Sequence, residues 1–240
     1  GAFPPVMAEL DLGAADLSGI FYQIVGHEIR SLFDELTADP ASASLAVRQL
    51  WTDQSTWLGV SQTERISVAS VRRSLIGDVA LERVADYLNG IDISLAERVE
   101  VDVARCVQHR DMHCGNVLFD ANGRPMVIDY PETGRSFASL DPVSLELSAI
   151  FHKDAPDWTG WPSEHQAEQW PDLDAFCEAS VCEQFVRACR AWAVEVAASE
   201  QEVLAVAYGY ALRQLKYDDT DKVLARAVIR ACIAGLLADG

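Results

Sequence analysis

The side chains best suited to catalysis lie in one short segment of this 240-residue chain, His109-Arg-Asp-Met-His-Cys-Gly-Asn116. Asp111 offers a carboxylate, Asn116 an amide oxygen, and Asp129, a little further along, a second carboxylate. Phosphoryl transfer uses such a set, because a carboxylate must orient the attacking hydroxyl and accept its proton while oxygen ligands hold Mg²⁺ against the nucleotide phosphates. We therefore expect Asp111 to act as the base and Asn116 and Asp129 to bind the metal and the nucleotide.

A small β element is expected to position these side chains. Three short strand-like runs are separated by the polar loop and by the turn signal Asp120-Ala-Asn-Gly123. They are Cys106–Gln108, Asn116–Phe119 and Pro125–Asp129. This arrangement would bring the three oxygen-bearing side chains to one edge of the β element.

Helical periodicity surrounds this element. From about residue 14 to 104, apolar residues such as Ile20 and Ile24 recur at three- to four-residue spacing, and Asn89-Gly90 predicts a helix end. After Asp141 the same period returns in four stretches, Val143–Phe151, Leu173–Ala197, Glu202–Leu215 and Lys222–Leu237. The expected fold is α+β and mainly helical, in a single domain: helical over 1–104, catalytic loop and hairpin over 105–130, and helical over 131–240.

Charge and composition exclude several classes of protein. The 37 acidic and 19 basic side chains give a net charge of −18, which argues against nucleic acid as the main partner because phosphate binding depends on clustered Lys and Arg. No apolar stretch approaches the roughly 20 residues of a membrane span, and we expect no membrane association. Six irregularly spaced cysteines without a CxxC motif do not predict a disulfide framework, so a reducing cytoplasm is the expected compartment.

The motif resembles that of a known family. His-Arg-Asp-x-x-x-x-Asn has the spacing of the kinase catalytic loop, and the longer string over Gln108–Tyr130 resembles the aminoglycoside phosphotransferase and choline kinase group of kinase-like enzymes. A weaker resemblance extends to Asp141-Pro-Val-Ser-Leu-Glu146, which is similar to the Asp-Pro-x-x-Asp segment of that group, with Glu146 where the group usually has Asp.

The resemblance implies a protein kinase-like C-terminal lobe with ATP, or another nucleoside triphosphate, and Mg²⁺ as cofactors. It implies that Asp111 is the base, that His109 packs the catalytic loop, and that His113 and Gly115 shape it. Arg110 stands where the group usually has Gly and matches the protein kinase form instead, which leaves the acceptor side of the site undefined.

The sequence predicts that the upper, N-terminal β lobe of a kinase is absent. Such a lobe supplies a Gly-rich loop and a Lys that reach the phosphates, but the chain has no GxGxxG, and its lysines, Lys153, Lys216 and Lys222, all follow the loop. The first hundred residues read as helices beginning near Met7. Either an N-terminal lobe lies upstream in a longer protein or it has been lost, and the start at Gly1 without Met favours a fragment.

Two other groups of residues have alternative interpretations. His109 and His113, four residues apart and next to Cys114, would suit a metal site on a helix, but a catalytic loop explains them better. Trp158, Trp161 and Trp170 stand among acidic residues, a lining that would suit a cationic acceptor. The simpler alternative is that these tryptophans pin an irregular connection to the core.

Two functions follow from these observations. The first is transfer of the γ-phosphoryl group of a nucleoside triphosphate to a hydroxyl of a small-molecule acceptor, with an upstream N-terminal lobe or a protein partner completing the site. The second is a catalytically inactive kinase-like module that binds a ligand or a protein. Retention of all three oxygen-bearing side chains favours the first.

Overall fold

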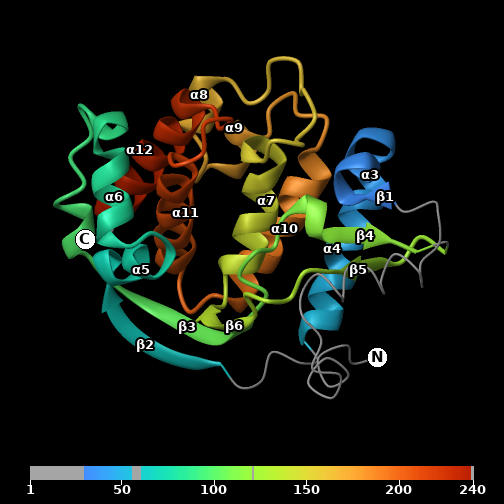
Figure 1. The fold of residues 1–240 in the computed structure, drawn as a ribbon, viewed down its shortest axis with the longest axis horizontal. Helices are drawn as coiled ribbons and strands as arrows, with labels where there is room; N and C mark the ends of the chain where they lie inside the picture. Colours follow the sequence, from blue (N-terminus) through green and yellow to red (C-terminus); the bar gives the residue numbers. More distant parts are fainter. Residues whose placement is uncertain (1–29, 56–60, 121, 239–240) are drawn as a thin grey trace.

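The computed structural model describes residues 30–55, 61–120 and 122–238 (Figure 1). It shows a mixed α+β protein in which helices predominate and the strands form two small antiparallel sheets of three strands each. The predicted fold class is confirmed at this level. Ile20, Ile24 and the expected start near Met7 lie outside the described residues.

The helices occupy most of the described chain. The α-helices are α3 (Leu32–Ala38), α4 (Pro40–Ser55), α5 (Val68–Leu75), α6 (Asp78–Val84), α7 (Leu140–Phe151), α8 (Glu164–Ala167), α9 (Leu173–Phe176), α10 (Glu183–Val196), α11 (Glu200–Gln214) and α12 (Lys222–Ala238). The 3-10 helices are η1 (Ala85–Leu88), η2 (Ala96–Arg98) and η3 (Cys114–Asn116).

The strands are short except for one pair. They are β1 (Arg30–Ser31), β2 (Gln62–Ser67), β3 (Glu100–Gln108), β4 (Val117–Phe119), β5 (Pro125–Val127) and β6 (Gly134–Phe137). One sheet has the order β1-β4-β5 and the other β2-β3-β6. The catalytic loop therefore leaves the end of β3 in one sheet and enters β4 in the other.

The predicted hairpin between β4 and β5 is confirmed. Val117 pairs with Val127, and the carboxylate of Asp120 accepts hydrogen bonds from the backbone N–H groups of Asn122 and Arg124. Gly123 has φ +75°, a conformation that glycine adopts without steric cost. The strand β5 ends at Val127, so Asp129 lies two residues beyond it.

The prediction of helices from 14 to 104 is wrong for two segments. β2 is a strand, and β3 begins at Glu100, six residues before the predicted run Cys106–Gln108. β2 shows no alternation of apolar and polar residues, because its first four residues face solvent at the edge of the sheet. Its pairing partner lies about 40 residues further along the chain, with Gln62 opposite Arg105. The short strand β6 was also missed.

The helix α7 lies in the middle of the helical part of the molecule, with α10 and α11 beside it (Figure 1). Eleven of its twelve residues are buried. One of these is Glu146, whose carboxylate accepts hydrogen bonds from Arg190 at 2.7 Å and from the indole of Trp170 at 2.8 Å. The guanidinium of Arg190 also lies 3.8 Å above the Trp170 ring. The buried carboxylate of Glu146 is therefore paired with a cation.

The predicted helix Leu173–Ala197 is two helices, α9 and α10. Ala179, in the connection between them, has φ +58°, which an α-helix cannot contain. The preceding tryptophans pin the irregular connection, as the simpler interpretation predicted: Trp170 is fully buried, and the indole N–H groups of Trp158 and Trp161 donate to the carbonyls of Ala149 and Phe176.

All six cysteines are free and buried. The sequence likewise predicted no disulfide framework. Over the described ranges, no helix is both long and apolar enough to cross a membrane.

Candidate functional site

A buried carboxylate fixes the start of the catalytic loop. Asp141, at the beginning of α7, is fully buried and accepts hydrogen bonds from the backbone N–H groups of His109 at 2.7 Å and Arg110 at 2.9 Å. The side-chain amide of Gln54 on α4 donates to the same carboxylate at 2.6 Å. Burial raises the pKa of Asp141, while these donors and the neighbouring His109 oppose the shift. The loop is therefore held against the most buried helix.

His109 connects the loop to the hairpin. Its ring is fully buried, and Nε2 lies 2.8 Å from the carbonyl oxygen of Ile128. A carbonyl oxygen can only accept a hydrogen bond, so Nε2 carries a proton and donates it in this contact. The backbone N–H of Ile128 in turn donates to the carbonyl of Asn116 at 3.0 Å. These two contacts bring the residue after Ile128, Asp129, next to the loop. They also occupy Nε2 of His109, whereas its Nδ1 is buried without a hydrogen-bond partner among the described residues.

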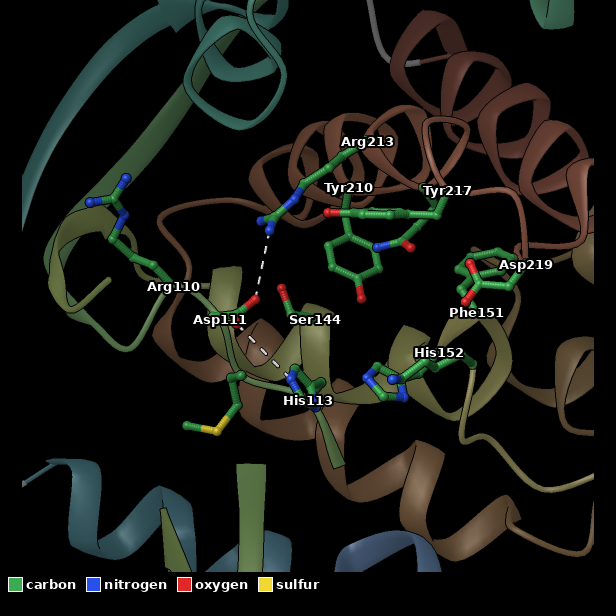
Figure 2. Close-up of a pocket in the computed structure, with 13 residues that line it drawn as sticks. Arg110, Asp111, His113, Ser144, Phe151, His152, Tyr210, Arg213, Tyr217 and Asp219 are labelled. Carbon is green, nitrogen blue, oxygen red and sulfur yellow. Dashed lines mark ion pairs between the residues drawn. The ribbon is translucent and has the colours of Figure 1, made fainter. Parts of the chain in front are cut away.

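Two residues of the site have left-handed backbone conformations. Arg110 has φ +71° and Asp129 has φ +64°, values that are uncommon for residues other than glycine and that gather at functional sites. The guanidinium of Arg110 lies against Gly134, where an added Cβ would approach Nη1 to 3.3 Å. Arg110 thus points towards β6 and away from Asp111 (Figure 2).

Asp111 and Asn116 lie together. The side-chain N–H of Asn116 donates to the backbone carbonyl of Asp111 at 2.9 Å, which leaves the amide oxygen of Asn116 free to bind a cation. Asn116 itself is buried, whereas the carboxylate of Asp111 is 37% exposed and that of Asp129 is also open to solvent. Both carboxylates are therefore accessible to a ligand.

The donor set fits Mg²⁺. This ion keeps several waters and usually takes one or two protein carboxylates together with substrate phosphates, so Asn116 and Asp129 are a sufficient protein contribution. No group of three His, Cys, Asp or Glu side chains that could hold a metal occurs among the described residues, and a site of this kind does not require one.

A cavity of about 290 Å³ opens beside Asp111 (Figure 2). Its lining comes from the catalytic loop, from α7 and the segment after it, and from α11 and the turn that follows: Arg110, Asp111, Met112, His113, Ser144, Phe151, His152, Lys153, Tyr210, Arg213, Gln214, Tyr217 and Asp219. None of the three tryptophans considered for a cationic acceptor is among them. Asn116 and Asp129 are not among them either, so they lie outside this cavity.

Arg213 and His113 flank the Asp111 carboxylate. Nη2 of Arg213 lies 3.6 Å from Oδ1 of Asp111, and Nε2 of His113 lies 4.0 Å from Oδ2. Nδ1 of His113 accepts the N–H of Gly115 at 3.1 Å, so in the neutral ring the proton is on Nε2 and faces Asp111. An added Cβ at Gly115 would approach Nδ1 to 3.0 Å, which explains the glycine.

Both histidines of the cavity are neutral at pH 7. The rings of His113 and His152 are stacked with their centroids 4.4 Å apart. Burial, followed by the neighbouring His152, lowers the pKa of His113 to about 4, and burial lowers the pKa of His152. Burial also lowers the pKa of Arg213, but Tyr217 and Asp111 raise it and the net shift is upwards. Arg213 is therefore the permanent cation next to Asp111.

Arg213, Tyr210 and His152 line the cavity but were not predicted from the sequence. The available signal was a polar stripe on the predicted helix Glu202–Leu215, where Tyr210, Arg213 and Gln214 share one helix face and Tyr217 continues it one turn later. Nothing local to that stripe indicates that it faces residue 111, about 100 residues earlier.

A catalytic loop fixed by a buried carboxylate, with an accessible aspartate beside an asparagine and a hairpin leading to a second aspartate, is the arrangement of a kinase-like phosphotransferase. The chain belongs to the phosphotransferase enzyme family, whose model matches residues 27–175 and so includes the loop, the hairpin and α7. Comparisons with curated proteins and with solved structures gave no match.

Proposed function

We propose that this protein transfers the γ-phosphoryl group of ATP, or of another nucleoside triphosphate, to a hydroxyl of a small molecule. The observation that carries this proposal is the position of Asp111. Its carboxylate opens into a cavity that could hold an acceptor, while its backbone carbonyl accepts a hydrogen bond from Asn116, one of the two residues that we propose bind the metal.

In this reaction the carboxylate of Asp111 accepts the proton of the acceptor hydroxyl. The acceptor oxygen forms a bond to the γ-phosphorus as the bond between that phosphorus and the bridging oxygen breaks, and a nucleoside diphosphate leaves. Asp111 is the catalytic residue. His109 and Arg110 are positioning residues, because their backbone N–H groups bind Asp141 and thereby orient the next residue.

Asn116 and Asp129 would hold Mg²⁺, which when bound neutralises the charge of the nucleotide phosphates. An N-terminal lobe supplied from upstream, or a protein partner, would cover the other side of the nucleotide. The alternative function is a kinase-like module that binds a ligand or a protein without catalysis. It predicts that Asn116 and Asp129 can be replaced without loss of binding to that ligand or protein.

The test is calorimetric titration of the full-length protein with ATP, with and without Mg²⁺. We expect Mg²⁺-dependent binding that Asp129→Ala and Asn116→Ala each weaken at least tenfold. Asp174→Ala is the matched control, since this carboxylate is 87% exposed on α9 and outside the site. Binding that is independent of Mg²⁺, or equal in all four proteins, would support the inactive module instead.

A further inference from the structure

The cavity beside Asp111 contains an arginine with unused hydrogen-bonding capacity. Arg213 comes from α11 and points across the cavity towards Asp111 (Figure 2). A guanidinium has five N–H donors, yet in the described part of the chain its polar partners are Tyr217 and the Asp111 carboxylate, and 3.6 Å is too long for a hydrogen bond to the latter. Several donors of a 29% exposed side chain are thus available to a ligand.

The other charges around the cavity support a bound anion. Lys153 and Arg110 bring the cations of the lining to three, and His113 and His152 are neutral. The lining contains two acids. Asp111 is engaged by the acceptor hydroxyl in the proposed reaction, and Asp219 lies on the opposite side of the cavity from Asp111 (Figure 2). The chain as a whole has a net charge of −18, so the positive charge of Arg213 makes this cavity differ in sign from the rest of the protein.

We propose that the acceptor carries an anionic group, a carboxylate or a phosphate, that binds Arg213. This inference rests on the proposed function. The planar fork of an arginine matches the oxygens of both groups, and Tyr210 and Tyr217 line the same wall and carry hydroxyl donors. An anion that takes the guanidinium away from Asp111 leaves that carboxylate free to accept the hydroxyl proton. The cavity volume lies near the lower limit of ligand pockets, about 300 Å³, so the acceptor is small.

The test measures binding without nucleotide, by calorimetric titration of the full-length protein with four compounds of similar size. These are glycerate and glycerol 3-phosphate, which carry the two candidate anions, glycerol, which is neutral, and choline, which is cationic. We expect at least one anionic compound to bind ten times more tightly than glycerol and choline. Arg213→Met should reduce that preference at least tenfold and Arg213→Lys should reduce it less, whereas Arg187→Met, on the exposed side of α10, should leave it unchanged.

Several outcomes would overturn the inference: tighter binding of choline, equal binding of all four compounds, no binding of any, or an anion preference that survives Arg213→Met. Circular dichroism melting of each variant separates loss of binding from loss of folding, and Arg213→Lys serves as the second variant. Glycerate against glycerol 3-phosphate distinguishes a carboxylate from a phosphate.

The inference and the proposed function can fail separately. Asp129→Ala should weaken Mg²⁺-dependent ATP binding at least tenfold while leaving the anion preference intact. Anion binding at Arg213 without any ATP binding would refute phosphoryl transfer alone. Mg²⁺-dependent ATP binding without an anion preference would refute the acceptor class alone.

Discussion

The carboxylate of Asp111 lies between Arg213 at 3.6 Å and His113 at 4.0 Å. Both distances are too long for a hydrogen bond, so the carboxylate remains accessible. Asp111→Asn keeps the shape of the side chain but cannot accept the acceptor's proton. We expect phosphoryl transfer to fall by roughly 10²–10⁴-fold, the usual contribution of a general base, while Mg²⁺-dependent ATP binding stays within twofold of the wild type. Single-turnover transfer and calorimetry on the same preparation check this, and an active Asn variant would remove Asp111 from the mechanism.

His113 makes stability depend on pH. Its pKa is about 4 in the folded protein against an ordinary value of 6.5, so between these values the unfolded chain binds more protons than the folded one. The free energy of unfolding therefore has its full value above pH 6.5 and falls as the pH drops towards 4. The loss from this residue is on the order of 1–3 kcal/mol.

His113→Asn is the matching variant, because an asparagine oxygen can still accept the N–H of Gly115 at the start of η3. Urea midpoints at pH 7 and pH 4.5 should differ less in the variant than in the wild type. The raised pKa values of the buried carboxyls Asp141 and Glu202 make both proteins more stable as the pH falls. Because this effect is the same in both, the difference between their pH profiles reports the contribution of His113. Parallel pH profiles would contradict the assignment.

At the scale of elements, the loop depends on one carboxylate at the start of α7. Asp141→Ala would leave buried the N–H donors of His109, Arg110 and Gln54. We expect a loss of roughly 2–4 kcal/mol in the free energy of unfolding, since each unpaired buried donor costs about 1–3 kcal/mol before relaxation. Urea unfolding measures this, with Asp157→Ala as an exposed control. A change below 0.5 kcal/mol, on the order of that at surface positions, would mean the loop is held by other contacts.

At the scale of the whole molecule, one buried carboxylate joins the β2-β3-β6 sheet to the helices. Oε2 of Glu202 accepts the N–H groups of Ala104 on β3 and Ala198 before α11, and Oε1 accepts the N–H and hydroxyl of Ser139 after β6. We expect Glu202→Ala to be the more destabilising variant and Glu202→Gln to be intermediate, because the amide oxygen of Gln keeps one of the two acceptor positions.

Amide hydrogen exchange of β3 provides the measurement. Protection of its N–H groups should fall most in Glu202→Ala and less in Glu202→Gln, together with the global stability. If Gln proved as harmful as Ala, repulsion between its amide NH2 and the donors that faced the second carboxylate oxygen would be the cause.

The sequence by itself determined the local parts of this protein. The loop from His109 to Asn116, the hairpin turn at Asp120 and the helices α7, α11 and α12 depend on residues a few positions apart, so turn chemistry and helical period were enough to predict them. The family followed from the same string, because its side chains act together at fixed spacing.

Only the tertiary structure decided what depends on distant residues. The exposed strand β2 is stabilised by pairing with β3, so no local period marks it. Asp141 reaches back about 30 residues to bind the start of the loop, and Arg213 reaches Asp111 across about 100. Such contacts form because packing of buried surface, rather than local backbone preference, sets which helix faces meet. The family motif around Asp111 was therefore visible in the sequence, whereas the charge of the cavity that faces it was not.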